Sequence, residues 1–318
     1  MKVKFRKPEP PPEFQDVIVW AAWLYYVDQM TQSEVARELG VSRASVVNYL
    51  QEARDKGIVS IQFDPGSIEN TLLSQQLRTR FGLEGCTVIP RTQTTEDLVP
   101  RLGKAAARTL SQMLQSGDVI GVAWGKTVLA AAQSISRTSL GNLTVVQVVG
   151  SIPGTVDFSP ELCTSVLANQ LNARCMNFLA PAVLSSRSLC NELLEEEVIA
   201  NQFQAIRSSR IILFGIGDIA AESTVVRSGF MESDLLRSYE QQGAVGTIIG
   251  RMLNAEGEQV CTEMDHRMIG LMLEEIRPIP CRLAVAGGIH KLEAIRATLR
   301  GGYVTHLVID FETASALI

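Results

Sequence analysis

Histidine is scarce in this chain, and cysteine occurs without the spacing that builds a metal site. Only three histidines stand among the 318 residues, and none forms HExxH or another ligand spacing. The six cysteines are scattered and form no CxxC pair, which argues against a zinc or disulfide framework. We therefore expect buried, reduced thiols and neither a metal nor a cofactor.

Long apolar runs and a basic excess are absent as well. The longest early apolar run, residues 17–27, is shorter than the ~20 residues that a membrane-spanning helix needs. Prolines follow the first basic residues where a signal peptide would have its apolar segment. We expect a cytoplasmic protein without a membrane partner. Because the net charge is −5, any DNA contact must come from a local basic patch.

The residue types divide the chain into four segments. Prolines at positions 8, 10, 11 and 12 lack the N–H that regular pairing needs, and Asp64-Pro65-Gly66 is a turn signal. The predicted segments are a flexible arm at 1–13, a helical block at 14–63 that ends in a short strand at 58–63, a linker helix at 64–82 and a large α/β domain at 83–318.

The stretch TQSEVARELGVSRASVVNYLQEARDKGIV, residues 31–59, has the spacing of two helices joined by a tight turn. Gly40 can adopt the positive φ that the turn needs, and Ser42 can cap the second helix. Apolar residues at 14–27 supply a third helix. The inward-facing residues of the three helices are expected to be Ile18, Ala21, Ala22, Leu24, Tyr25, Val35, Ala36, Leu39, Val46, Tyr49 and Leu50. This pattern predicts a helix-turn-helix core.

The outward face of the second helix carries groups that suit base edges and phosphates in a major groove. The residues predicted to contact DNA are Gln32, Ser33, Ser42, Arg43, Ala44, Ser45 and Asn48. The alternative is an ordinary helical hairpin with a solvated polar face. One such module binds DNA weakly because affinity grows with the number of phosphate contacts, so we expect a homo-oligomer on operator double-stranded DNA.

Beyond residue 82, apolar β-branched runs alternate with helical runs. The predicted strands are 86–90, 118–124, 143–150, 177–184, 210–217, 244–253, 282–288 and 306–310. The predicted helices are 97–115, 126–137, 160–172, 188–202 and 291–300. This alternation predicts a parallel sheet covered by helices on both faces. Several strands end in glycine, which points to ligand binding at their carboxyl ends.

Three loops at these strand ends carry the candidate effector-binding residues. Gly125, Lys126 and Thr127 offer backbone N–H groups, an ammonium and a hydroxyl to a phosphate, although a glycine turn with a solvated lysine remains possible. Lys291 opens a helix against the helix dipole, a position that a bound anion would favour. The remaining candidates are Gly215, Gly217 and Asp218, of which Asp218 could instead cap a helix, and the weaker Gln147 and Ser151.

Six stretches resemble one bacterial family in the same order. They are AAWLYYVDQMTQSEVARELGVSRASVVNYLQEARDKGIV, GVAWGKT, VVQVVGS, LFGIGD, GAVGTIIGRMLNAEGEQV and RLAVAGGIHKLEAIRATLRGGYVTHLVID. The chain resembles the SorC/DeoR-type sugar-responsive transcriptional regulators. The resemblance implies a winged helix-turn-helix followed by a Rossmann-like domain related to sugar-phosphate isomerases and glucosamine-6-phosphate deaminases. It also implies a tetramer, a phosphorylated sugar or polyol effector, and a contact from Lys291 to the effector phosphate.

Thr247 departs from the family pattern, because family members usually carry Asp or Glu at this position, where the carboxylate faces the effector hydroxyls. The exchange leaves a neutral hydroxyl. We therefore expect an effector that is less hydroxylated, is a polyol derivative, or is held through other groups.

Three functions compete at this point. The first is a regulator of a carbohydrate or polyol catabolic operon, gated by the effector. The second is a sugar-phosphate isomerase or deaminase with a fused helical module, but the loop residues show no convergent acid–base pair, and His290 is the only histidine among them. The third is a constitutive DNA-binding protein whose α/β domain serves assembly alone. The sequence favours the first.

Overall fold

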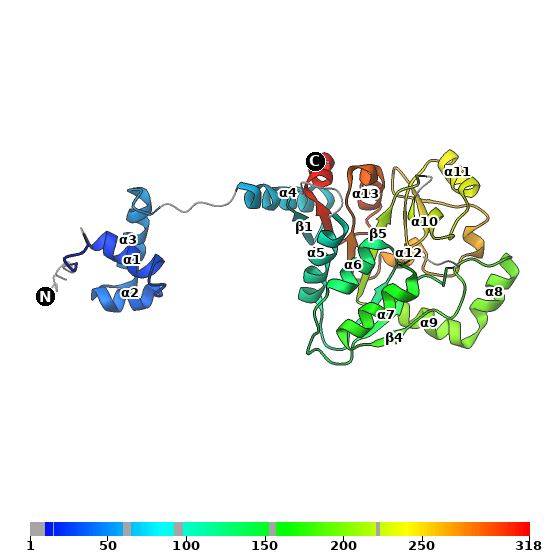
Figure 1. Cartoon of the computed structure of the whole chain (residues 1–318), viewed down its shortest axis with the longest axis horizontal. Helices are drawn as coiled ribbons and strands as arrows, with labels where there is room; N and C mark the ends of the chain where they lie inside the picture. Colours follow the sequence, from blue (N-terminus) through cyan, green and yellow to red (C-terminus); the bar gives the residue numbers. More distant parts are fainter. Residues whose placement is uncertain (1–9, 15, 60–64, 92–97, 153–156, 221–222) are drawn as a thin grey trace. The chain divides into compact units, whose positions relative to one another are not determined.

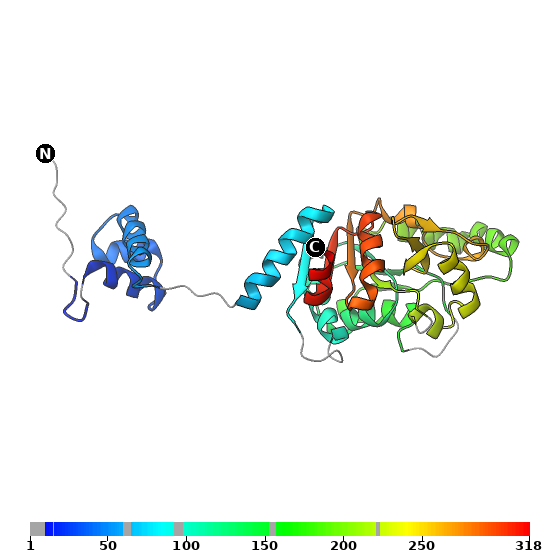
Figure 2. The same ribbon diagram turned by 90° about the horizontal axis from the view of Figure 1, so that it is seen from above.

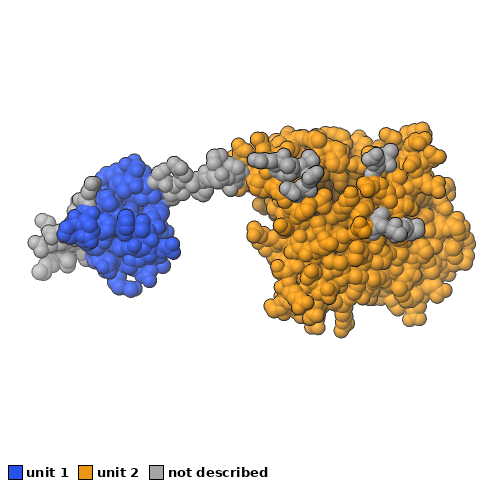
Figure 3. Space-filling view, viewed as in Figure 1, with its two compact units in different colours: residues 1–64 blue, residues 65–318 orange. Residues whose placement is uncertain are grey.

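The computed structural model describes residues 10–14, 16–59, 65–91, 98–152, 157–220 and 223–318. The chain forms two compact units, residues 1–64 and 65–318, which are coloured separately in Figure 3. Within the described ranges, no helix is long and apolar enough to cross a membrane, and no three potential ligands from His, Cys, Asp and Glu are grouped as a metal site.

The smaller unit holds three helices around one apolar core. They are α1 (Val17–Tyr26), α2 (Gln32–Leu39) and α3 (Arg43–Asp55). Of the predicted inward residues, Tyr25 and Tyr49 are partly buried, and the others are buried together with Ala53. Each helix contacts the other two, so the predicted three-helix core is confirmed.

Local capping fixes where these helices begin and end. Thr31 and Glu34 form a capping box at the start of α2, and the Ser42 hydroxyl accepts a hydrogen bond from Ser45 N at 3.1 Å. Gly40 ends α2 with φ of 65°, as predicted for the tight turn. The predicted strand at 58–63 lies for the most part outside the described residues.

The larger unit is built on a sheet whose main path has the order β1-β10-β9-β5-β2-β3-β4, with all neighbours parallel (Figure 1). The strands are β1 (Gly85–Ile89), β2 (Val119–Val122), β3 (Thr144–Gln147), β4 (Arg174–Met176), β5 (Ile211–Gly217), β9 (Cys281–Val285) and β10 (His306–Asp310). The central residues of β2, β3, β5, β9 and β10 are almost completely buried, as expected for a parallel sheet with helices on both faces, whereas the edge strand β4 is exposed at Arg174 and Cys175. Six of the predicted strands are confirmed here.

Right-handed crossovers place the connecting helices on opposite faces of this sheet. The helices α5 (Leu98–Met113), α6 (Lys126–Ser134) and α7 (Pro160–Leu171) lead toward β4, and neighbours in this series pack together. The helices α9 (Glu197–Arg207) and α13 (Leu292–Arg300) lead back toward β1 and therefore cover the other face. The predicted helices at 126–137, 160–172 and 291–300 are thus present.

The first and last helices of the larger unit lie side by side near the β1 edge (Figure 2). They are α4 (Pro65–Phe81) and α14 (Phe311–Leu317). Leu77 of α4 is fully buried in the core of this unit, so the predicted linker helix packs against β1. The helix begins at Pro65, where the sequence suggested a turn.

Three predicted elements differ from the structure. Residues 177–184 make only isolated bridges at Pro181 and Val183, because a proline cannot donate to a ladder. Residues 244–253 fold as an antiparallel hairpin of β6 (Ala244–Ile248) and β7 (Arg251–Asn254), which joins β5 to the short β8 (Gln259–Val260). The helix predicted at 188–202 is two helices, α8 (Arg187–Glu195) and α9, because Glu196 is extended.

Several short elements were not predicted. They are β4, β8 and α14, whose bounds are given above, together with α10 (Thr224–Arg227), α11 (Ser233–Gln241), α12 (Leu273–Ile276) and the 3-10 turns η2 (Asp265–Arg267) and η3 (Ile289–Lys291). All six cysteines are free, but Cys175 and Cys261 are exposed, contrary to the expectation that the thiols are buried.

Candidate ligand-binding cavity

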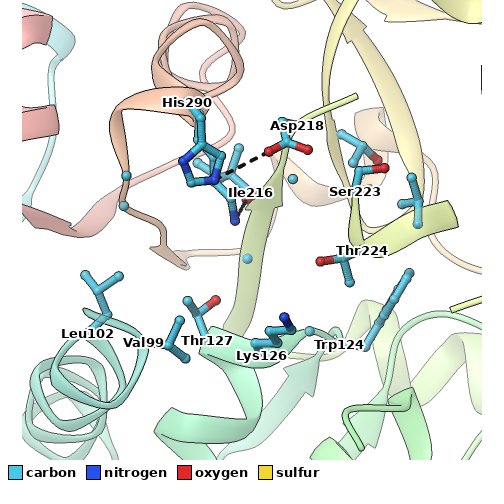
Figure 4. A pocket seen from close by; sticks show the side chains of 18 of the residues that line it. Val99, Leu102, Trp124, Lys126, Thr127, Ile216, Asp218, Ser223, Thr224 and His290 are labelled. Atoms are coloured by element: carbon cyan, nitrogen blue, oxygen red, sulfur yellow. Dashed lines mark hydrogen bonds and ion pairs between the residues drawn. The ribbon is translucent and has the colours of Figure 1, made fainter. Parts of the chain in front are cut away.

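A cavity of about 480 Å³ opens at the carboxyl ends of β2, β5 and β9 (Figure 4). These strands are neighbours in the sheet, and the connections that leave β2 and β9 run in opposite directions. Such a reversal leaves a crevice outside the strand ends, where open α/β sheets bind ligands. The volume suits a small molecule.

The first turn of α6 forms one wall of the cavity. Gly125 precedes this helix with φ of 124°, a conformation that glycine tolerates, and caps it without a side chain. The first N–H groups of α6 are therefore not capped by a side chain. Lys126 is exposed at the start of the helix, while the Thr127 hydroxyl donates to Val285 O at 3.2 Å and ties α6 to β9.

Lys291 enters the same cavity from the β9 side. Its Nζ donates to Ile216 O at 3.1 Å, and no carboxylate lies within salt-bridge distance of it among the described residues. Burial lowers the pKa of Lys291; Asp218 opposes that shift and Lys126 adds to it. An ammonium that burial destabilises is stabilised by an anion, so the Lys126 and Lys291 pair favours an anionic ligand.

Asp218 and His290 face each other across the cavity mouth, with Oδ2 and Nε2 3.5 Å apart (Figure 4). This pair corrects the expectation that the loops bring no acid and base together. The imidazole side chain is 64% exposed, so the pair lies at the rim. Asp218 does not cap α10, whose N-cap is Ser223.

A buried carboxylate holds the loop between β9 and η3 in place. Asp310 Oδ2 accepts from Gly288 N at 2.8 Å, and Oδ1 accepts from Thr313 N at 3.0 Å at the start of α14. A Cβ on Gly287 would lie 2.5 Å from Asp310 Oδ2, so this close approach requires glycine.

The rest of the wall is apolar, with a few hydroxyls. The apolar side chains belong to Leu98, Val99, Leu102, Trp124, Ile216, Val225, Ile249 and Ile289. The hydroxyls of Ser223 and Thr247 are buried and have no hydrogen-bond partner among the described residues. Ile249 has φ of 48° in the turn between β6 and β7, a strained conformation for a β-branched residue.

Eight of the ten predicted effector-binding residues line this one cavity. They are Gly125, Lys126, Thr127, Gly215, Gly217, Asp218, Thr247 and Lys291. Gln147 and Ser151 do not line it. Gln147 donates to Val149 O and accepts from Phe178 N, and Ser151 Oγ donates to Phe178 O, so both brace the segment after β4.

Sequence reasoning missed Ser223, Thr224, Trp124 and Ile249 as part of the wall. Trp124 stands next to the predicted Gly125 and could have been included on that ground. Ser223 caps the short α10 and Thr224 begins it, and the sequence gives no periodic signal for a helix of this length. Ile249 was placed inside a continuous strand, which hid the turn that brings it to the cavity.

The seven predicted DNA-contacting residues all lie in the smaller unit, on α2, on α3 and at the N-cap of α3. Ser33, Ser42, Arg43, Ala44 and Asn48 are exposed. The half-buried Gln32 accepts from Arg43 Nε at 3.2 Å, which joins the starts of α2 and α3. The half-buried Ser45 hydroxyl lies 2.9 Å from that of Ser42. An exposed apolar side chain, Val47, lies on the same helix and was not predicted.

An α/β unit with an anion-favouring cavity at its topological switch point defines a small-molecule-binding domain. A family model described as "Putative sugar-binding domain" matches residues 67–318. The chain belongs to this family, that of the SorC/DeoR-type sugar-binding transcriptional regulators, which confirms the resemblance seen in the sequence.

Relatives and solved structures agree with this assignment. The uncharacterized transcriptional regulator YjhU of Escherichia coli K12 is 35% identical over 312 residues, covering 95% of this chain and 94% of the relative. The transcriptional regulator LsrR of Escherichia coli K12 is 31% identical over 313 residues, covering 96% and 95%. The full-length sorbitol operon regulator SorC from Klebsiella pneumoniae matches with a TM-score of 0.74 and 28% identity, covering 95% of this chain and 97% of that one.

These similar proteins are transcriptional regulators rather than enzymes. The chain is accordingly a transcriptional regulator with a sugar-binding domain, and no comparison supports the isomerase or deaminase alternative.

Proposed function

We propose that this regulator reads operator double-stranded DNA with α3 and senses a phosphorylated sugar or polyol in the cavity of the larger unit. The observation that carries the proposal is the convergence of the α6 N-terminus, Lys126 and Lys291 at one topological switch point. A phosphate there gains uncapped N–H groups and two ammonium groups. A mixed α/β domain that only served assembly would have no need of these groups.

In the proposed DNA contact, α2 and α3 act as a helix-turn-helix. Arg43 reads a base edge while hydrogen-bonded to Gln32, and Ser42, Ala44, Ser45 and Asn48 approach neighbouring bases or phosphates. Ser33 contacts the phosphate backbone from the start of α2. The proposed wing would follow α3, at positions outside the described residues.

The proposed assembly is a cytoplasmic homotetramer. One small helical unit makes few phosphate contacts, and affinity for DNA rises with their number, so several copies on one duplex supply the binding strength. Exposed leucines and valines on α8 and α9, namely Leu189, Leu194 and Val198, offer apolar surface of the kind that subunit contacts bury.

Effector binding would alter DNA affinity through a coupling that is reciprocal. If the effector changes operator affinity by a given factor, operator DNA must change effector affinity by the same factor. The test begins with thermal shift of the whole protein against a panel of sugar and polyol phosphates, with each unphosphorylated parent as the control. The best ligand is then titrated with and without a duplex carrying the operator.

The expected result is a phosphorylated ligand whose affinity differs at least several-fold between the free and the DNA-bound protein. Equal affinity in both states would contradict the regulatory proposal. Turnover of the ligand would favour the isomerase-like alternative instead.

A further inference from the structure

The described polar groups that line the cavity carry more cationic than anionic side chains. Lys126 and Lys291 only donate hydrogen bonds, whereas the hydroxyls of Ser223, Thr224 and Thr247 can donate or accept. Among the described lining residues, Asp218 is the sole carboxylate, and it already faces His290 Nε2 at 3.5 Å. The described wall therefore offers little charge repulsion to a second anionic group on the ligand.

Two backbone carbonyl oxygens hold side chains of the cavity wall in place. Ile216 O accepts from Lys291 Nζ, and Val285 O accepts from the Thr127 hydroxyl. A carbonyl oxygen has two lone pairs, so these bonds fix the positions of Lys291 and Thr127 without excluding a further donor.

Two hydroxyls in the wall have unused hydrogen-bonding capacity. Ser223 is 6% exposed and Thr247 is 4% exposed, and neither hydroxyl has a partner among the described residues. Ser223 is the N-cap of α10, yet its side chain makes no capping hydrogen bond. Buried hydroxyls without partners are costly, and a bound ligand is one way in which they become satisfied.

The two hydroxyls come from different elements of the same wall. Ser223 precedes α10, while Thr247 lies on β6, where its Cγ2 occupies the space left by the missing side chain of Gly217. In the view of Figure 4, Ser223 and Thr224 lie on the side of Trp124, away from Val99 and Leu102. The opposite wall is apolar and suits C–H groups better than hydroxyls.

We propose that the effector is a phosphorylated acid, with a phosphate at one end held by Lys126 and Lys291 and a carboxylate at the other end that accepts from Ser223 and Thr247. This inference deepens the proposed function and rests on it. A carboxylate can accept from both unpartnered hydroxyls, and the described lining carries two ammonium groups against one carboxylate. An acidic residue at position 247 would repel that carboxylate, and threonine does not.

The test compares ligands that differ only in the oxidation of one carbon. The pairs are 3-phosphoglycerate with glycerol 3-phosphate, erythronate 4-phosphate with erythritol 4-phosphate, and gluconate 6-phosphate with sorbitol 6-phosphate. Dissociation constants are measured with the full chain by calorimetry, with inorganic phosphate as a probe of the phosphate end alone. The pair that contains the tightest-binding ligand shows which carbon-chain length fits the cavity. Within that pair, the acid is expected to bind at least tenfold more tightly than its alcohol.

Substitutions test whether the hydroxyls of Ser223 and Thr247 cause the preference for the acid over the alcohol. Thr247→Val and Ser223→Ala are each expected to reduce the acid-to-alcohol preference at least threefold and to leave affinity for inorganic phosphate unchanged. Thr247→Asp is expected to abolish the preference or reverse it. The matched controls are Thr313→Val and Ser209→Ala, which remove buried hydroxyls that also have no partner in the part of the chain that the structure describes but lie outside the cavity lining.

The outcomes separate this inference from the proposed function. If an alcohol phosphate binds as tightly as its acid or more tightly, the acid proposal is wrong while the phosphate-gated regulator stands. If neither inorganic phosphate nor any phosphorylated ligand binds, both proposals fail together.

Discussion

The two units of this regulator hold their candidate binding residues in opposite ways. In the smaller unit the residues are surface groups placed by capping interactions between near neighbours in sequence, such as Ser42 with Ser45. In the larger unit Lys126 and Lys291 come from opposite halves of the unit and meet only because β2, β5 and β9 are adjacent in the sheet. The candidate DNA-contacting surface therefore depends on local structure, whereas the cavity forms only when the strands of the sheet are assembled in order.

The largest expected effect tests the cavity. Lys291→Ala removes an ammonium proposed to contact phosphate and should weaken effector binding by about 2–5 kcal/mol, the usual cost of truncating one partner of a buried charge pair. Effector-free DNA binding should not change. Calorimetry measures the affinity for the effector, and titration with DNA measures the affinity for the operator. The control is Lys104→Ala, on the exposed side of α5. Loss of DNA binding with a normal effector response would contradict the assignment.

The corresponding change in the smaller unit is Arg43→Ala. If Arg43 reads a base, affinity for the operator should fall by about 1–3 kcal/mol, and discrimination at that base pair should relax. Lys56→Ala serves as the control because Lys56 pairs with Glu52 at 2.7 Å near the end of α3. A uniform loss across all sequences would mean that Arg43 contacts phosphate instead.

A third change tests how strongly the cavity depends on distant packing. Gly287→Ala places a Cβ 2.5 Å from Asp310 Oδ2 and 2.9 Å from Leu102 Cδ1, so the loop must shift. The free energy of unfolding of the larger unit should fall by about 1–3 kcal/mol. Urea unfolding measures it. Gly141→Ala, where a Cβ would meet nothing within 4 Å, is the matched control.

A smaller and more local loss is expected from Ser42→Ala. Removing this N-cap should destabilise α3 by about 1 kcal/mol. Hydrogen exchange of the α3 amides in the full chain should speed up, while the larger unit is unaffected. Ser33→Ala should leave those amides unchanged. If hydrogen exchange in the larger unit also became faster, the stabilities of the two units would be coupled more strongly than is expected for two separate cores.

The smallest effect concerns pH. Because the folded-state pKa of Lys291 lies below 10.5, the unfolded chain binds an extra proton between that lowered pKa and 10.5. The contribution of Lys291 to the free energy of unfolding therefore rises as pH rises through this window. Urea unfolding at about pH 8 and about pH 10 should show a rise in wild type that Lys291→Met lacks. An anionic ligand should reduce the rise.

The same contrast explains what the sequence could predict. The capping residues Thr31 and Ser42 and the turn at Gly40 follow short-range rules, so the ends of α2 and α3 were predictable. The loops after β2, β5 and β9 were also predictable, because glycine marks where the strands end. That these loops meet at one cavity could be predicted only from the order of the strands in the sheet. The residue pattern indicates this order only through the resemblance to a family.

The predictions for residues 244–253 and for position 147 were wrong for physical reasons. In residues 244–253 every position except Arg251 is apolar or small enough for a buried strand, and the turn at Ile249-Gly250 carries isoleucine where a two-residue hairpin usually has asparagine or glycine. Position 147 lies at the carboxyl end of β3, which suggested ligand binding, but its amide bonds to backbone groups. A side chain's partners cannot be inferred from its position at a strand end.

Asp310 links the cavity loop to the last helix of the larger unit. One carboxylate both caps α14 and holds Gly288 N, so the start of this helix and the loop beside Lys291 share a single anchor. Phe311, Ala314 and Leu317 of α14 are buried in the core of the larger unit. Substitutions that loosen the packing of α14 should therefore reach the loop beside Lys291 without touching the cavity wall.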